Sequence, residues 1–243
     1  MSNSKLPERA SLEYLKKRAK DRLQELRRAD PRATLATALL SVARDHGFSS
    51  WRSLKAELDQ RQKKNVALFF EACAKGDVAV LRGLLAHDPS LARVSNPEGR
   101  YQGWTGLHSA AQRGHVDAVR LLLDHGADPN AREAGDNTYA LHWAAAHGHL
   151  ETVRALLDAG GDVHGIGDVH ALDVIGWATF YRAPGDDPTQ MDGSRRDLVS
   201  LLLERGAIHH IFSAMSVGDL DLIQKVVEHL RGATVLHSRF ERL

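Results

Sequence analysis

The feature that most constrains the fold of this 243-residue chain is an internal repeat. The segment "WTGLHSAAQRGHVDAVRLLLDHGADPNA" (104–131) aligns with "YALHWAAAHGHLETVRALLDAGGDVHG" (139–165) at an offset of 34 residues, as at His108 and His142. A fixed period of this size is typical of proteins built by stacking one small structural unit. The repeat therefore predicts an elongated stack rather than a globular core.

Weaker copies of the pattern lie on both sides of these two units. "FFEACAKGDVAVLRGLLAHDP" begins at Phe69, and "IFSAMSVGDLDLIQKVVEHL" begins at Ile211. A fourth unit is split between "LDVIGWATFY" at Leu172 and "LVSLLLERGA" at Leu198, with about 15 extra residues between the halves. The extra segment is rich in Pro, Gly and Asp, which predicts a loop.

Each unit is expected to form two short helices. The first, such as "LHSAAQRG", carries small alanines that allow close helix approach, and the second, such as "DAVRLLLDHG", ends on a glycine that can cap a helix C-terminus. One such unit cannot bury its own apolar face, but several stacked units can. The fold class predicted is all-α, a solenoid of about five helix-turn-helix units with an N-terminal three-helix cap.

The stretch "TGLHSAAQRGHVDAVRLLLDHGADPN" resembles the ankyrin repeat, whose pattern begins T-P-L-H-x-A-A-x-x-G-H. The resemblance implies an ankyrin repeat domain over 65–243. Its units lie near 66–95, 96–131, 132–165, 166–207 and 208–243, the last a degenerate C-terminal cap. The chain departs from the pattern at Gly106 and Ala140, which replace the proline, and at Asp173, which replaces the histidine of the fourth unit.

Residues 1–64 have a different pattern and are expected to form a helical leader. Apolar residues recur at helical spacing over 12–26 and 35–43, and "FSSWRSLKAEL" predicts a third short helix capped by Ser49 or Ser50. These helices would shield the open end of the stack. Similar leaders with a Gly-Phe-x-x-Trp-x-x-Leu pattern precede repeats in some bacterial ankyrin proteins, so we expect a bacterial source.

The charge is unevenly distributed along the chain. Residues 1–65 hold 16 Lys and Arg against 8 Asp and Glu, and residues 66–243 hold 16 against 23. A basic arm could bind nucleic acid, but the basic residues here alternate with acids at helical spacing, which favours a solvated helix face. The acidic repeat region would favour a partner with basic patches.

Other features of the sequence bound the environment of the protein. The single cysteine, Cys73, excludes an intramolecular disulfide and is interpreted as a core residue. The N-terminus lacks the apolar core of a signal peptide, and no segment has the roughly 20 apolar residues of a membrane span. We expect a cytoplasmic monomer that makes no membrane contact.

The histidines suggest a metal site, but the repeat explains most of them. The resemblance implies that His108 and His142 bond within their repeat and to the neighbouring turn. It also implies that His115 and His149 bond to backbone in the next unit. The spacing of His142, His147 and His149 does not match the paired histidines of a zinc-protease helix. We expect neither a metal nor another cofactor, and only His147 lacks a structural role.

In the ankyrin pattern, the finger loops and first helices line a concave face. Tyrosine, tryptophan and arginine on such a face are typical of binding hot spots, although an ordinary wetted surface is the alternative. Trp143 instead falls in a packing position and is predicted to lie in the core between repeats. The predicted contact residues are Tyr101, Gln102, Trp104, Gln112, Arg113, Asp136, Asn137, His147, Trp177 and Tyr181.

Two functions remain open from the sequence. The first is a non-catalytic scaffold that binds another protein through the concave face and the fingers. The second is an enzyme or small-ligand-binding protein that uses the groove. The insertion at 183–197 would then act as a lid over Trp177, Tyr181, Asp173 and His147. No catalytic or phosphate-binding motif is present, which favours the scaffold. An enclosed cavity at Asp173 or His147 would favour the second function.

Overall fold

The computed structural model of the chain describes residues 6–7, 11–99, 101–180 and 193–229. Contacts divide the chain into two compact units, Met1–Leu68 and Phe69–Leu243. The described residues are mainly helical and contain no named strand, only an isolated bridge between Ser95 and Thr105. The predicted all-α fold class is therefore confirmed.

The first unit contains α1 (Leu12–Ala29), α2 (Leu35–Asp45) and most of α3 (Trp51–Lys75). A side-chain hydroxyl caps each helix. Ser11 accepts the Tyr14 amide, Thr34 accepts the Thr37 amide, and Ser50 accepts the Ser53 amide. Their shared core is made of Leu6, Leu15, Ala19, Val42, Ala43 and Leu54, with Leu39, Phe48, Trp51 and Leu58 packed against it.

Helix α3 is longer than the short third helix predicted for the leader. It runs for 25 residues and ends on Lys75, before Gly76. No glycine or proline interrupts it, and Ala, Leu, Lys, Glu and Gln, all strong helix formers, make up most of it. The helix therefore continues into the segment that opens the first repeat.

The second unit is a series of helix pairs. The last turns of α3 precede α4 (Val78–His87) and the 3-10 helix η1 (Pro89–Arg93). The pairs that follow are α5 (Gly106–Gln112) with α6 (Val116–Asp124), α7 (Ala140–Ala146) with α8 (Leu150–Asp158), and α9 (Val174–Phe180) with α10 (Gly193–Glu204). Helix α11 (Ile211–Val217) begins the last pair, and residues 220–229 are helical.

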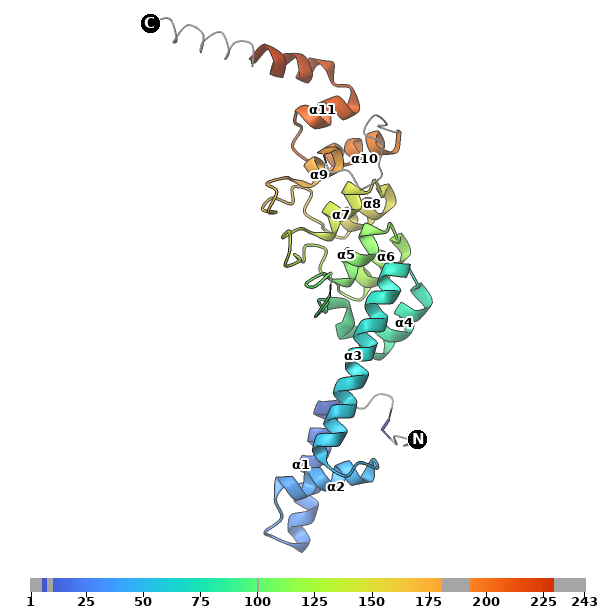
Figure 1. Cartoon of the computed structure of the whole chain (residues 1–243), viewed down its shortest axis with the longest axis vertical. Helices are drawn as coiled ribbons and strands as arrows, with labels where there is room; N and C mark the ends of the chain where they lie inside the picture. The colour runs from blue at the N-terminus through green and yellow to red at the C-terminus, as the bar shows by residue number, and fades with distance from the viewer. Residues whose placement is uncertain (1–5, 8–10, 100, 181–192, 230–243) are drawn as a thin grey trace, which may run out of the picture. The chain divides into compact units, whose positions relative to one another are not determined.

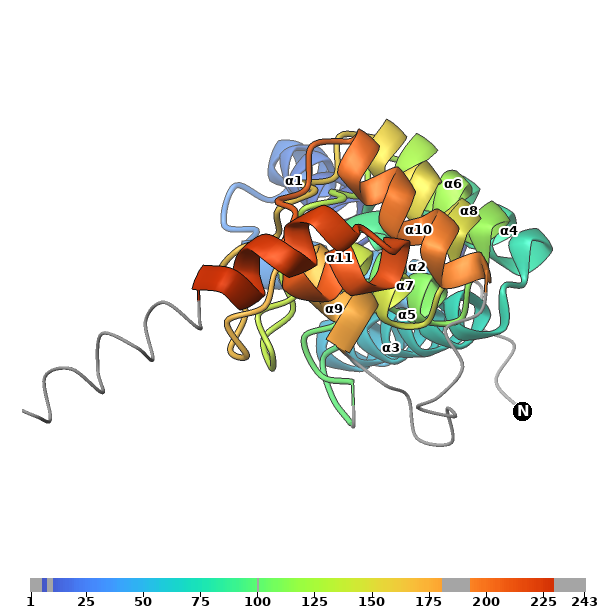
Figure 2. The same ribbon diagram turned by 90° about the horizontal axis from the view of Figure 1, so that it is seen from above.

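The helices of the second unit form two rows. First helices α5, α7 and α9 contact one another in order, and second helices α6, α8 and α10 do the same through α8. Figures 1 and 2 show these rows side by side, with loops extending beyond the first row. We name these loops the first finger (94–105), the second finger (125–139) and the third finger (159–173).

A glycine–histidine turn joins the two helices of a repeat. Gly114 has φ 71°, a left-handed conformation that glycine adopts without strain. Its Cα faces the ring of His149, and an added Cβ would lie 2.6 Å from Nδ1 of that ring. Nε2 of His149 lies 3.1 Å from the carbonyl oxygen of Gln112, and Nε2 of His115 lies 3.1 Å from that of Ala74.

These contacts correct one prediction. The rings of His115 and His149 contact backbone carbonyls of the preceding unit, whereas we expected contacts with the backbone of the next unit. Each histidine begins the second helix of its own unit, and its side chain leans toward the helix N-terminus and the earlier turn. His115 and His149 therefore each fasten their own repeat to the one before it.

The departure from proline at Gly106 also has a packing cause. A Cβ at this position would lie 2.8 Å from the Phe69 ring and 3.0 Å from Sγ of Cys73. Phe69 and Cys73 are fully buried, and burial raises the pKa of the Cys73 thiol to about 12. The interpretation of Cys73 as a core residue is confirmed. No described helix is long and apolar enough to cross a membrane.

Candidate functional site

The buried histidines hold the fingers in place. Nδ1 of His142 accepts the Tyr139 amide at 3.0 Å, so Nε2 carries the proton and donates to the Gly165 carbonyl at 3.0 Å. His108 makes the same pair of contacts with Thr105 and the Thr138 carbonyl. Burial lowers the pKa of each ring to about 4. The predicted structural role of both histidines is confirmed.

A row of aromatic rings runs along the first helices and the fingers. The Trp143 ring lies 4.8 Å from Trp104 and 5.4 Å from Trp177, and Tyr101 lies 4.7 Å from Trp104, centroid to centroid. The Trp143 indole donates to Oγ1 of Thr138 at 2.9 Å, so its polar atom is satisfied inside the stack. Trp143 belongs to the core between repeats, as predicted.

The prediction that Trp104 and Trp177 face solvent is wrong. Trp104 is 6% exposed and Trp177 is 1% exposed. The Trp177 indole donates at 2.8 Å to Oδ2 of Asp168, itself buried in the third finger. Each ring is covered by a ring from a neighbouring unit, which the repeat position alone does not reveal. These two tryptophans therefore stabilise the surface from beneath.

Asp136 and Asn137 link the second finger to the third. Asn137 has φ 58°, and its side-chain amide donates to the Gly167 carbonyl at 2.7 Å. The Asp136 carbonyl accepts the Val169 amide at 3.0 Å, and its carboxylate lies 3.5 Å from Nε2 of His170. Both residues are half-buried. They therefore have a structural role that the sequence analysis did not assign to them.

The remaining predicted contact residues differ in exposure. Gln102 and Arg113 are exposed, while Tyr101, Gln112 and His147 are half-buried. Arg113 follows α5 and His147 follows α7 at equivalent positions, 34 residues apart. Tyr181 lies outside the described residues. The structure thus leaves Gln102 and Arg113 as the most accessible members of the predicted set.

His147 has structural contacts that the sequence analysis did not expect. Its Nδ1 lies 2.9 Å from the Trp143 carbonyl oxygen, one turn earlier in the chain. Its ring also stacks on that of His149, with centroids 6.0 Å apart and an interplanar angle of 11°. His125 contacts the Leu121 carbonyl in the same way after α6. The view that His147 lacks a structural role is therefore wrong.

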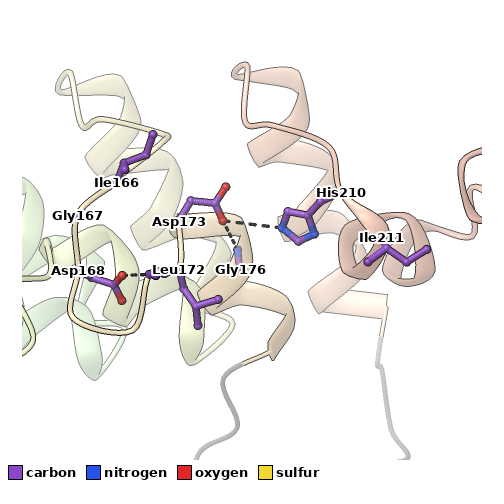
Figure 3. A pocket seen from close by; sticks show the side chains of 9 residues that line it. Ile166, Gly167, Asp168, Leu172, Asp173, Gly176, His210 and Ile211 are labelled. Carbon is purple, nitrogen blue, oxygen red and sulfur yellow. Dashed lines mark hydrogen bonds and ion pairs between the residues drawn. The ribbon is translucent and has the colours of Figure 1, made fainter. Parts of the chain in front are cut away.

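A pocket of about 500 Å³ lies between the third finger and α11. Figure 3 shows the Asp173 carboxylate inside it, facing the ring of His210. Oδ1 of Asp173 caps α9 by accepting the Gly176 amide at 2.7 Å, and it lies 3.8 Å from Nε2 of His210. The lining residues are Ile166, Gly167, Asp168, Ala171, Leu172, Asp173, Gly176, His210 and Ile211.

One signal for this pocket is visible in the sequence, because Asp173 stands where the repeat pattern has histidine. The opposite wall, from α11, could not be found without the tertiary structure. The described lining offers carboxylates and an imidazole but no Ser, Thr, Cys or Lys nucleophile. Within the described ranges, no three His, Cys, Asp or Glu residues are grouped to hold a metal ion.

Comparisons with known proteins agree with the geometry. The family described as ankyrin repeats (3 copies) matches residues 39–133 and 69–166. The human NAD-capped RNA hydrolase NUDT12 is 40% identical over 77 residues, 32% of this chain and 14% of that protein. The mouse 2-5A-dependent ribonuclease is 41% identical over 68 residues, 28% of this chain and 9% of that protein.

The human tRNA endonuclease ANKZF1 is 46% identical over 67 residues, which make up 26% of this chain and 9% of that protein. The chain thus spans less than a fifth of the length of each of these relatives. From the family match and the observed stack of helix pairs, we conclude that the chain belongs to the ankyrin repeat family.

Proposed function

We propose that the second unit is a non-catalytic scaffold that binds another protein through its first helices and fingers. The observation that carries the proposal is that these elements combine a buried frame with exposed polar side chains. The tryptophan row, in which the indoles of Trp143 and Trp177 are hydrogen-bonded, fixes the backbone. Gln102 and Arg113 extend from the same elements into solvent. Fold alone does not establish function, so the proposal depends on this surface.

The physical advantage of such a surface is preorganisation. Binding costs free energy when loops and side chains must be ordered, and the hydrogen bonds between the second and third fingers remove part of that cost in advance. Residues 66–243 hold 16 basic and 23 acidic side chains, so a partner with basic patches would associate faster. A cytoplasmic location, a monomeric state and a bacterial source remain expectations from the sequence.

The test compares two exposed arginines of one repeat. Peptides would first be selected from a random displayed library on the full chain, and their affinity measured by calorimetry. Arg113→Ala, at the end of α5, should weaken binding by about tenfold, as expected for an arginine at a binding surface. The matched control is Arg120→Ala in α6, whose side chain is 56% exposed and faces Asp117.

The outcomes of this comparison are clear. Weaker peptide binding by the Arg113→Ala chain, with unchanged binding by the Arg120→Ala chain, would support a binding surface on the first helices and fingers. Equal losses of affinity in the two variants would contradict it. Trp104→Ala is unsuitable as a probe of binding. Its ring is buried, so the change would remove packing worth about 3–5 kcal/mol and would report on folding.

An alternative function, small-ligand binding, is favoured by the pocket beside Asp173. Its volume of about 500 Å³ falls in the range of small-molecule sites, about 300–1,000 Å³. Because the described lining lacks a nucleophile, this alternative is one of binding rather than covalent catalysis. The proposed lid at 183–197 lies outside the described residues except for 193–197, which begin α10.

A further inference from the structure

The pocket between the third finger and α11 combines apolar walls with two carboxylates, those of Asp168 and Asp173. Ile166, Leu172 and Ile211 contribute the apolar surface, and Ile166 is 66% exposed at the rim. The Asp173 side chain is only 19% exposed. A charged group in this position is shielded from water on most sides, so its charge interacts more strongly with an incoming ligand than a surface carboxylate would.

The two oxygens of Asp173 differ in their partners. Oδ1 accepts the Gly176 amide and faces His210, as described above. Oδ2 has no partner among the described residues, and Figure 3 shows it turned away from Gly176. A partly buried carboxylate oxygen without a donor is a strong acceptor for a charged hydrogen-bond donor.

The charges around the pocket leave Asp173 without a permanent positive neighbour. Among the described residues, no lysine or arginine lines the pocket. The guanidinium of Arg132 donates to the carbonyl of Ile166, a lining residue, and also to the Asn137 carbonyl and the Tyr139 hydroxyl. The ring of His210 lies opposite, with its Nε2 3.8 Å from Oδ1 of Asp173.

Asp168 adds to the negative potential, but both of its carboxylate oxygens already accept hydrogen bonds. Its Oδ1 accepts the Leu172 amide at 2.7 Å and its Oδ2 accepts the Trp177 indole. Among the carboxylate oxygens of the described lining, only Oδ2 of Asp173 is therefore left without a hydrogen-bond donor, and it lies in an apolar setting. Lysine and arginine side chains match this arrangement, because each joins an aliphatic stem to a charged donor.

We propose that this pocket receives a lysine or arginine side chain of the partner protein, with its charged end on Asp173 and its stem between Ile166 and Ile211. The proposal rests on the proposed function and extends it by naming the chemistry of one contact. It also makes the pocket part of the recognition surface. In the fourth unit this acceptor stands where the repeat pattern has histidine.

The experiment uses the full chain and a random displayed peptide library. Peptides selected on the wild type should be enriched in Lys or Arg next to apolar residues. Asp173→Asn keeps Oδ1 as acceptor for the Gly176 amide and removes only the charge. The Asp173→Asn chain should bind these peptides with an affinity lower by about tenfold or more, the effect expected when a charged hydrogen bond is lost.

The matched control is Asp124→Asn, which removes the same charge from an exposed residue at the end of α6. It should leave affinity within about twofold, as for a screened surface charge. Ile166→Ser provides a second variant, because Ile166 is exposed and its loss should not unfold the repeat. It should lower the affinity for the same peptides by about a few-fold, because the aliphatic part of the lysine or arginine side chain loses its contact with Ile166.

The chemistry of the peptide is tested directly. Replacing the key arginine by citrulline, which is neutral and of similar shape, should weaken binding as much as Asp173→Asn does. Undiminished binding of the citrulline peptide, or equal binding to the Asp173→Asn and wild-type chains, would overturn the proposal. If N-acetylarginine amide alone binds as tightly as the peptides, the pocket is a small-cation site, and the partner-protein assignment fails.

The same peptides separate this inference from the proposed function. Peptides that depend on Arg113 but not on Asp173 would leave the proposed function standing and refute the pocket assignment. A library that yields no binder to the wild-type chain would count against both. Thermal melts of each variant, compared with the wild type, would show that weaker binding does not arise from unfolding.

Discussion

At the residue scale, His108 and His142 illustrate how burial changes what an ionisable ring can do. Both rings are fully buried, and desolvation lowers the pKa of each to about 4 in the folded state. In the unfolded chain a histidine has a pKa of about 6.5. Below that pH the unfolded state binds more protons, so the free energy of unfolding falls as pH drops from about 6.5 toward 4.

We therefore predict that acid destabilises the repeat unit before its carboxylates titrate. Each of the two rings should contribute up to about 1.4 kcal/mol of lost stability per pH unit within this window. Urea unfolding at pH 7.5, 6 and 5 measures the effect, and His108→Gln should flatten the slope while lowering stability at pH 7.5. Equal stability at pH 7.5 and pH 5 would contradict the prediction.

At the element scale, the turn between the two helices of a repeat depends on glycine for two separable reasons. Gly114 and Gly148 occupy equivalent turns with φ of 71° and 74°. A Cβ at Gly114 would meet the His149 ring at 2.6 Å, whereas a Cβ at Gly148 would meet nothing within 4 Å. One position therefore combines a left-handed backbone with a close ring, and the other has the backbone constraint alone.

We predict that Gly148→Ala costs about 1 kcal/mol, the strain of a left-handed alanine. Gly114→Ala should cost about 2–4 kcal/mol, because it adds overpacking against His149. Chemical denaturation of the two single variants measures the difference. If both variants lose the same stability, then close approach of the histidine ring does not constrain this turn.

At the scale of the whole molecule, the two units contain separate cores. The core of the first unit includes Leu15, and the second unit buries a different set that includes Leu122; both side chains are fully buried. In a stacked protein, stability is close to a sum of local contributions. Damage to one core should therefore remain largely local.

We predict that Leu15→Ala, at a cost of about 2–5 kcal/mol, speeds hydrogen exchange in α1 and α2 and leaves protection in α5 to α8 unchanged. Leu122→Ala is the reciprocal change. It should speed hydrogen exchange in α5 to α8 and leave exchange in α1 and α2 unchanged. Native-state exchange read by mass spectrometry resolves both regions. Loss of protection throughout the chain after either change would show that the two units unfold together.

The sequence by itself determined the features that depend on local periodicity. The 34-residue offset predicted the repeated helix pairs. The resemblance to the ankyrin repeat implied the structural roles of His108 and His142 and the packing position of Trp143. These features follow from the sequence because each repeat unit has the same internal geometry. The length of α3 was also encoded locally, in an uninterrupted run of helix-forming residues.

Only the tertiary structure decided which side chains of one unit are buried by, or hydrogen-bonded to, the neighbouring units. The burial of Trp104 and Trp177 results from rings in neighbouring units, and His149 finds its partner 37 residues earlier in the chain. The pocket beside Asp173 forms because α11 supplies the wall facing the third finger. Side-chain burial and unpaired acceptors depend on contacts between distant segments, and the pattern of a single repeat does not contain that information.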